Sequence, residues 1–318
     1  MRLTVPLALL LAVLLVAPAA VVFATRGDDP PAGAGVRVAE VRVDGAPTDI
    51  TLAQGRAWVP TAGTGELAAI GDRDALSVQA TYPARAGALR LASDGFSIWL
   101  AGASGNALTS VDPLFGGRAS RRTVGVGGDA VDVAAGRDGV WVSNGAKGTV
   151  TRIDPVAGRA VGEPIRTGRF PTALAVGTRD VWVVNSGDGT LARIDPRENL
   201  VVGRRVLVGR DPQDVAIGFG SVWVANRGDG TLSRVDERTG RPQSTVKLGG
   251  APTALAITTE GVIVLDADDG KVTRLDARTR EVTDVVRVGG FPTALAVGDG
   301  PSLWTVDARR GVVTRVSR

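Results

Sequence analysis

The chain has 318 residues, of which 44% are hydrophobic, so it is long enough to bury a large core. It contains no cysteine and no histidine, which excludes disulfides, thiol nucleophiles, imidazole bases and the commonest metal ligands. The formal net charge of +4 permits a nucleic-acid partner without requiring one.

The N-terminal segment has the pattern of a secretory signal. Arg2 precedes an uncharged stretch, residues 3–25, that is rich in Leu, Val and Ala. We expect residues 1–25 to be either a signal peptide cleaved after Ala24 or, if uncleaved, a membrane anchor. Residues 26–35 read as a flexible linker, because they are rich in Gly, Pro and Asp. The rest of the chain is therefore expected outside the cytoplasm, secreted or membrane-anchored.

From residue 36 to residue 318 the sequence repeats with a period of about 41 residues. The clearest marker is a tryptophan that occupies six of seven equivalent positions, while Ile263 occupies the other one. The six are Trp58, Trp99, Trp141, Trp182, Trp223 and Trp304. A period of 40–45 residues made of short strand-like runs is typical of β-propeller blades. The repeat predicts an all-β fold, a seven-bladed β-propeller in a single domain, residues 36–318.

Each copy divides into four strand-like runs, which predict a four-stranded antiparallel blade. In the fourth copy the runs are residues 172–176, 181–185, 190–195 and 200–208. The first run is built of small residues, which suits the crowded inner end of a blade. The second is apolar on both faces, as expected of a strand covered by a neighbouring sheet on each side.

The two ends of the repeat region predict how the ring closes. The last copy contains only three strand-like runs before the sequence stops. The missing outer strand precedes the first copy, as residues 36–43. We expect this N-terminal strand to join the last blade, because ring closure removes exposed sheet edges.

Tight turns are predicted between the second and third strands. The pattern Asn-x-Gly-Asp-Gly-Thr occupies residues 185–190 and 226–231, with a variant at residues 144–149. Asn and Gly tolerate the left-handed backbone of such turns, and the Asn side chain can bond nearby amides. We interpret these segments as structural.

The repeated residues resemble a known family. Val-Trp-Val-x-Asn-x-Gly-Asp-Gly-Thr-Leu-x-Arg-Ile/Val-Asp, with Pro-Thr opening a unit, is similar to the YVTN-type or YncE-like β-propellers, and through them to virginiamycin B lyase-like propellers. The resemblance implies a secreted or envelope-attached propeller, often without assigned activity, and some such proteins bind DNA. The lyase branch implies a histidine base and a magnesium ion, and this chain has no histidine to carry that role.

A ligand site is expected at the mouth of the central channel, where the loops entering each first strand meet the turns between strands two and three. Two residues after the repeated Pro position the copies differ, with Asp49, Arg90, Asp132 and Asp214 among them. The three carboxylates could converge on a hard cation such as calcium or magnesium. The alternative, which we favour, is that each accepts local backbone amides or pairs with Arg90.

The residues immediately before the Pro position also differ between copies, and they complete the candidate ligand-binding set. They include Asp129, Phe170, Asp211 and Phe291. The two phenylalanines either line a binding surface or fill the gap between two blades, and we favour the second interpretation.

An arginine recurs on the predicted third strand. The series is Arg152, Arg193, Arg234, Arg274 and Arg315. Its repetition indicates a scaffold role, joining one blade to the next, rather than phosphate binding.

No catalytic residue stands out, so we predict a non-enzymatic, monomeric scaffold that binds a protein, peptide or cell-envelope ligand at the channel mouth. A first alternative is a metal-dependent lyase or lactonase that uses Asp49, Asp132 and Asp214. A second is a DNA-binding propeller, which the modest net charge and the scarcity of free aromatics disfavour.

Overall fold

The computed structural model describes residues 36–71, 76–84, 87–102, 106–112, 120–298 and 302–317. The expected signal segment, residues 1–25, and the linker, residues 26–35, lie outside these ranges. Within the described ranges every regular element is a strand. These ranges contain no helix that is long and apolar enough to cross a membrane.

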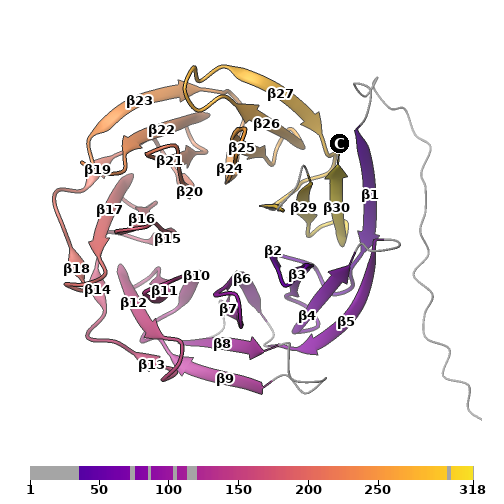
Figure 1. Ribbon diagram of the computed structural model, residues 1–318, viewed down its shortest axis with the longest axis horizontal. Helices are drawn as coiled ribbons and strands as arrows, with labels where there is room; N and C mark the ends of the chain where they lie inside the picture. The colour runs from indigo at the N-terminus through magenta and orange to yellow at the C-terminus, as the bar shows by residue number, and fades with distance from the viewer. Residues whose placement is uncertain are drawn as a thin grey trace, which may run out of the picture.

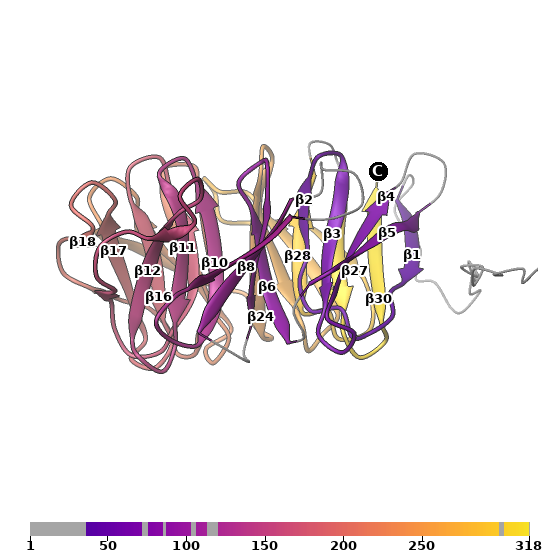
Figure 2. The same cartoon turned by 90° about the horizontal axis from the view of Figure 1, so that it is seen from below.

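The strands form seven antiparallel sheets arranged as blades around a ring, which confirms the predicted seven-bladed propeller (Figure 1). Seen edge-on the ring is a disc, with the strand ends on its two faces (Figure 2). In each blade the first strand is innermost and the fourth lies at the circumference.

The first four blades follow one another along the chain. Blade 1 contains β2 (Thr51–Ala53), β3 (Arg56–Thr61), β4 (Glu66–Gly71) and β5 (Ser77–Pro83). Blade 2 contains β6 (Ala88–Ser93), β7 (Ile98–Gly102), β8 (Ala107–Asp112) and β9 (Ser120–Gly125). Blade 3 contains β10 (Ala130–Gly136), β11 (Gly139–Asn144), β12 (Thr149–Asp154), β13 (Arg159–Ala160) and β14 (Ile165–Arg166). Blade 4 contains β15 (Pro171–Val176), β16 (Val181–Asn185), β17 (Thr190–Asp195), β18 (Leu200–Val201) and β19 (Val206–Leu207).

The last three blades complete the ring, and blade 7 combines the two ends of the repeat region. Blade 5 contains β20 (Pro212–Gly218), β21 (Ser221–Asn226), β22 (Thr231–Asp236) and β23 (Pro242–Lys247). Blade 6 contains β24 (Pro252–Thr258), β25 (Gly261–Asp266), β26 (Lys271–Leu275) and β27 (Val282–Arg287). Blade 7 contains β28 (Ala294–Val297), β29 (Leu303–Asp307), β30 (Val312–Ser317) and β1 (Arg37–Arg42).

The core lies between adjacent blades, and the repeated tryptophan is its largest component. Every residue of the second strands β11, β16 and β21 is buried, as their apolar sequences predict. Trp223 of blade 5, for example, packs against Leu255 and Val262 of blade 6. Each tryptophan therefore fills the space between its own blade and the next one.

The outer strand of blade 4 differs from the expected continuous run, residues 200–208. It consists of two short pieces, β18 and β19, which pair separately with β17. Gly203 lies between them with a left-handed φ of 72°, so the chain leaves the ladder there. The outermost strand has no further neighbour, and such an interruption breaks few main-chain hydrogen bonds.

The N-terminal strand closes the ring as predicted. β1 pairs antiparallel with β30, with Arg37 opposite Ser317 and Arg42 opposite Val312. An ion pair between Glu40 and Arg310, with an N–O distance of 3.0 Å, joins the same two ends of the chain.

Candidate functional site

The entrances to the first strands and the hairpins between the second and third strands lie on one side of the disc. In blade 5, Pro212 at the start of β20 is opposite Asn226 at the end of β21. Pro171 and Asn185 have the same relation in blade 4. We call this side the channel-mouth face.

A small central pocket opens where the seven first strands meet. Its volume is about 140 Å³. Every blade contributes to its lining, through Asp49, Arg90, Asp132, Thr172, Asp214, Thr253 and Ala294. The structure therefore brings together the four charged residues that the sequence placed two positions after the proline. The lining threonines were not expected from the sequence, because a threonine at a strand entrance carries no distinct signal.

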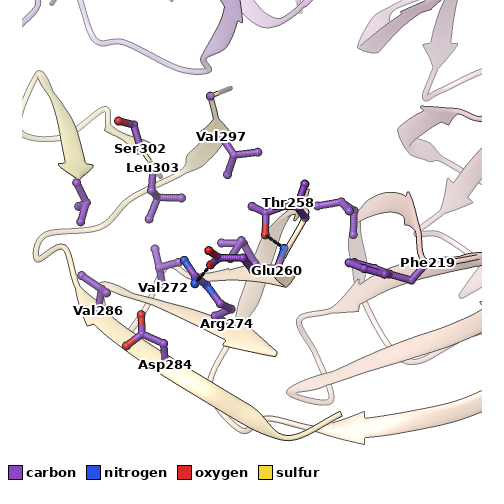
Figure 3. A pocket seen from close by; sticks show the side chains of 15 residues that line it. Phe219, Thr258, Glu260, Val272, Arg274, Asp284, Val286, Val297, Ser302 and Leu303 are labelled. Atoms are coloured by element: carbon purple, nitrogen blue, oxygen red, sulfur yellow. Dashed lines mark hydrogen bonds and ion pairs between the residues drawn. The ribbon is translucent and has the colours of Figure 1, made fainter. Parts of the chain in front are cut away.

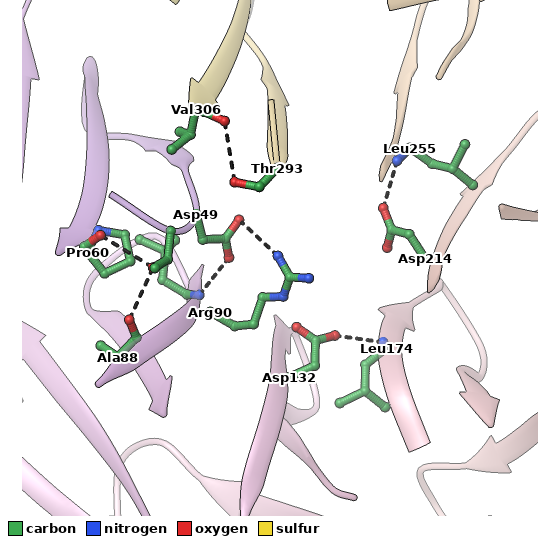
Figure 4. A network of polar contacts seen from close by, with 12 residues as sticks. Asp49, Pro60, Ala88, Arg90, Asp132, Leu174, Asp214, Leu255, Thr293 and Val306 are labelled. Atoms are coloured by element: carbon green, nitrogen blue, oxygen red, sulfur yellow. Dashed lines mark hydrogen bonds and ion pairs between the residues drawn. The ribbon is translucent and has the colours of Figure 1, made fainter. Parts of the chain in front are cut away.

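Each of the three aspartates joins its own blade to the next through a main-chain amide (Figure 4). The amides of Leu91, Leu174 and Leu255 donate to Asp49, Asp132 and Asp214, with N–O distances of 2.9, 2.8 and 2.7 Å. The first strand pairs on one side only, so main-chain groups on its other edge need partners from elsewhere. The carboxylates supply those partners between blades 1 and 2, 3 and 4, and 5 and 6.

Arg90 provides the positive charge of the pocket. Its guanidinium lies 3.9 Å from the carboxylate of Asp49. Burial by itself would lower the pKa of Arg90, but attraction to Asp49, Asp132 and Asp214 outweighs that effect and raises the pKa. The three carboxylates, when ionised, therefore stabilise the charged form of the arginine.

Burial has the opposite effect on the carboxyl groups. It raises the pKa of Asp132 to about 7, against the attraction of Arg90 and with the repulsion of the other two carboxylates. It also raises the pKa of Asp214 to about 6, against hydrogen bonds from the amides of Leu255 and Val215. The pKa of Asp49 is raised for the same reason, and Arg90 offsets part of the rise. The pocket therefore exchanges protons with solvent at pH values near neutrality.

The arrangement does not fit the cation that the sequence suggested for Asp49, Asp132 and Asp214. Among the described residues no group of three Asp or Glu side chains could hold a metal ion. One oxygen of each aspartate already accepts an amide proton. Arg90 supplies the charge compensation that a cation would bring. The divalent-cation hypothesis stays a prediction without supporting geometry.

The predicted residues before the proline lie at the entrances to the first strands, on the channel-mouth face, and we call these entrance loops the rim. Phe170 and Phe291 are 48% and 46% exposed, so neither fills the space between two blades completely. Phe170 reaches across to the preceding blade, where its ring approaches Gly145. The Arg309 guanidinium lies over the Phe291 ring, 4.2 Å from its centroid.

The two acidic residues of the rim bind nearby groups of the protein. Both carboxylate oxygens of Asp129 accept the amide proton of Ala146, at 3.1 and 3.2 Å. Asp211 accepts a hydrogen bond from the Gln213 side chain at 2.6 Å. Both aspartates thus help to hold the rim in one conformation.

The rim loops are clamped to the neighbouring hairpins by the main chain. The amides of Ser186 and Gly187 donate to the carbonyls of Phe170 and Arg169, both at 3.0 Å. Phe170 adopts a φ of 53°, which is an outlier for a bulky side chain. The residues at the same position in blades 1 and 5 also have a left-handed φ, 56° and 48°, so this conformation belongs to the repeat.

The arginine series on the third strands has the predicted scaffold role, with one feature that the sequence did not reveal. Arg152 donates to the carbonyl of Pro196, and Arg193 to that of Arg238, each in the next blade. The arginines also lie over the tryptophan opposite them in the ladder, with distances to the ring centroid between 5.0 and 5.7 Å. The pairs are Arg152 on Trp141, Arg193 on Trp182, Arg234 on Trp223 and Arg315 on Trp304.

Comparison with known proteins establishes the fold alone. No protein-family model matches the sequence, and no curated protein matches it either. Hydrazine synthase from Kuenenia stuttgartiensis has a TM-score of 0.77 at 15% identity, covering 87% of this chain and 97% of that one. Virginiamycin B lyase from Staphylococcus aureus has a TM-score of 0.76 at 14% identity, covering 89% and 99%. BamB from Moraxella catarrhalis has a TM-score of 0.66 at 18% identity, covering 89% and 98%.

These similarities show that the chain has the β-propeller fold, which the repeat predicted. The narrower resemblance to YVTN-type or YncE-like propellers stays a prediction, because no family model matches.

Proposed function

We propose that this protein is a non-enzymatic, extracytoplasmic binding module whose rim recognises a protein, a peptide or a cell-envelope ligand. The observation that carries the proposal is the pair of half-exposed phenylalanines, Phe170 and Phe291, on rigid loops of the channel-mouth face. Exposed aromatic side chains supply much of the energy of protein interfaces.

The size of the central pocket supports a partner that lies across the face rather than inside it. About 140 Å³ holds only a few water molecules. Pockets for small-molecule ligands are usually about 300 to 1,000 Å³. A lyase or lactonase that used Asp49, Asp132 and Asp214 would have to accommodate its substrate in this pocket, beside carboxylates that already bind main-chain amides.

The extracytoplasmic location rests on the pattern of residues 1–25, with Arg2 followed by an uncharged apolar stretch. The similar folds include BamB and the WD40 propeller domain of Doa1, the latter with a TM-score of 0.73 at 13% identity. They are compatible with a propeller that acts as a scaffold.

Site-specific photocrosslinking tests the proposal. A photoreactive phenylalanine analogue is placed at Phe170 or Phe291 in the full-length chain, expressed in the source organism, and the control position is Phe96. Phe96 is 74% exposed in the turn between β6 and β7, at the opposite end of its blade. We expect discrete adducts from the two rim positions and none from Phe96.

Digestion of the adducts identifies the class of partner. A nuclease-resistant adduct whose tryptic digest contains peptides of a second polypeptide, identified by mass spectrometry, supports a protein or peptide. Loss with nuclease would replace the proposal with the DNA-binding alternative, and the absence of rim-specific adducts would contradict a binding role for this face.

A further inference from the structure

The repeated tryptophan follows one packing rule, and blade 6 breaks it. In blades 1 to 5 the tryptophan is at most 1% exposed and packs against apolar residues of the following blade. In blade 6 the equivalent residue is Ile263, which is much smaller. Between blades 6 and 7, the side chain of Ile263 therefore leaves open part of the space that an indole ring fills between the earlier pairs of blades.

The consequence is a cavity of about 800 Å³ between blades 6 and 7 (Figure 3). Ile263 and Val272 of blade 6 face Val297, Leu303 and Val316 of blade 7 across it. Leu303 is only partly buried, whereas residues at the same position in other blades, such as Val222, are fully buried. The apolar residues of blade 7 that face blade 6 thus lack the tryptophan against which the equivalent residues of other blades pack.

Arg274 remains at the position where other blades hold an arginine over the ring. It lies opposite Ile263 in the ladder, as Arg234 lies opposite Trp223. Its Nε is buried without a hydrogen-bond partner, and its guanidinium pairs with Glu260. The cavity therefore keeps a guanidinium plane suited to an aromatic ring, with no ring from this chain opposite it in the ladder.

A hydrogen-bond acceptor for an indole N–H is also present. Trp58 and Trp223 donate from Nε1 to the carbonyl of the residue five positions earlier, Ala53 and Gly218. The corresponding residue for Ile263 is Thr258, which lines the cavity. Phe219 adds an aromatic side chain at the cavity, from the adjacent blade.

We propose that this cavity is a binding site for an indole ring supplied from outside the chain, either as a free small molecule or as a tryptophan side chain. The ring lies between Ile263 and Leu303, stacks on Arg274 and donates its N–H to the Thr258 carbonyl. Glu260 and Asp284 outnumber Arg274 around the cavity, so the site favours neutral or cationic indoles over anionic ones.

The site lies at the end of the blades remote from the channel mouth, and the inference does not depend on the proposed rim function. Thr258 and Glu260 belong to the turn between the first and second strands of blade 6, opposite the hairpin that begins after Asp266.

Ligand-observed fluorine NMR with 5-fluoroindole tests the proposal on the full-length protein. We expect saturable binding that indole displaces, and binding of indole-3-acetate at least 10-fold weaker than that of indole. Ile263→Trp restores the residue of the other blades, so it should fold, raise the Tm and weaken 5-fluoroindole binding at least 10-fold. Ile263→Val, which leaves the space open, is the matched control and should bind as the wild type does.

Displacement by N-acetyltryptophanamide separates the two sources. Displacement identifies a site that also accepts a tryptophan side chain, whereas failure to displace restricts it to free indoles. If I263W does not fold, Leu303→Phe narrows the same cavity from blade 7 and should weaken binding likewise. No saturable binding of 5-fluoroindole at millimolar concentration, or equal binding by the filled variants, would overturn the proposal.

Discussion

In the central pocket, an aspartate side chain can both join two blades and interact with the charge of Arg90. Asp132 accepts the amide proton of Leu174 and also faces the positive charge of Arg90. The first role joins two blades, and the second compensates charge that the surrounding protein would otherwise leave uncompensated. The network is therefore a structural feature of the ring that also sets the electrostatic potential at the channel mouth.

This network predicts an unusual dependence of stability on pH. Asp132 and Asp214 keep their protons in the folded state up to about pH 7 and about pH 6. In the unfolded chain they lose them near pH 4. Between these values the folded state binds more protons, so the free energy of unfolding falls as the pH rises. We expect the Tm to decrease by roughly 2–5 °C from pH 5 to pH 8, measured by circular dichroism.

The double variant Asp132→Asn, Asp214→Asn is the control for this prediction. The amide oxygen of asparagine can still accept the main-chain proton, but the side chain no longer titrates. The exposed aspartates with lowered pKa values, such as Asp229 and Asp276, affect stability only below about pH 4. An unchanged slope between pH 5 and pH 8 in the double variant would assign the effect to other groups.

At the scale of single elements, the hairpins between the second and third strands explain the Asn-x-Gly-Asp-Gly pattern residue by residue. In blade 5, Asn226 is fully buried and donates to Thr231 and Ser233. The sequence suggested that this asparagine could adopt a left-handed backbone, but its φ is not positive. Gly228 lies so close to the Arg210 carbonyl that a Cβ would be 3.1 Å from it. Asp229 accepts the amide proton of Arg210, and Gly230 has a φ of 62°.

Two effects favour glycine in these turns, and they can be measured separately: a left-handed φ and a lack of space for a Cβ atom. Gly220 and Gly230 have nearly the same φ, 65° and 62°, but only Gly230 would place a Cβ near another main-chain atom, 3.0 Å from the Gly250 carbonyl. We expect Gly220→Ala to lower the free energy of unfolding by about 1 kcal/mol, and Gly230→Ala to lower it by clearly more. Denaturant titration measures both.

Gly125 provides the reference for these two variants. It has no left-handed φ, and nothing lies within 4 Å of an added Cβ. Gly125→Ala should therefore leave the free energy of unfolding unchanged or slightly increased. If G220A and G230A lowered the free energy of unfolding equally, the close approach of the added Cβ to the Gly250 carbonyl would not be destabilising.

At the scale of the whole molecule, stability depends on closing the ring. Six residues of β1 pair with β30, and all other blades are formed from consecutive strands. Without β1, the third strand of blade 7 becomes an exposed edge that can pair with other chains. The N-terminal strand is therefore expected to contribute far more to stability than its length suggests.

A pair of truncated chains tests this expectation. A chain beginning at Gly45 lacks β1, and we expect its Tm to fall by on the order of 10 °C and the protein to aggregate. A chain beginning at Val36 keeps β1 and should unfold as the full-length protein does. Calorimetry and size-exclusion chromatography measure both effects, and equal behaviour of the two chains would contradict a closing role for β1.

Most of the architecture was readable from the sequence, because it depends on local patterns that recur every 41 residues or so. The six tryptophans and Ile263 define seven blades, and the unmatched strand before the first copy indicates how the ring closes. Turn chemistry is local as well, which is why the hairpins could be placed correctly. The outer strands of blades 3 and 4 are each split into two pieces, with a left-handed glycine, Gly162 or Gly203, between the pieces, and this interruption escaped prediction.

The candidate sites depended on contacts between distant parts of the chain. The sequence placed Asp49 and Arg90 at equivalent positions, but their pairing, and the link from each aspartate to the next blade, follow from how seven sheets pack around an axis. The sequence likewise marked Ile263 as the exception among the tryptophans. Whether that exception leaves a cavity is decided by how far blade 7 approaches blade 6, because packing between sheets sets that distance and no pattern within one repeat records it.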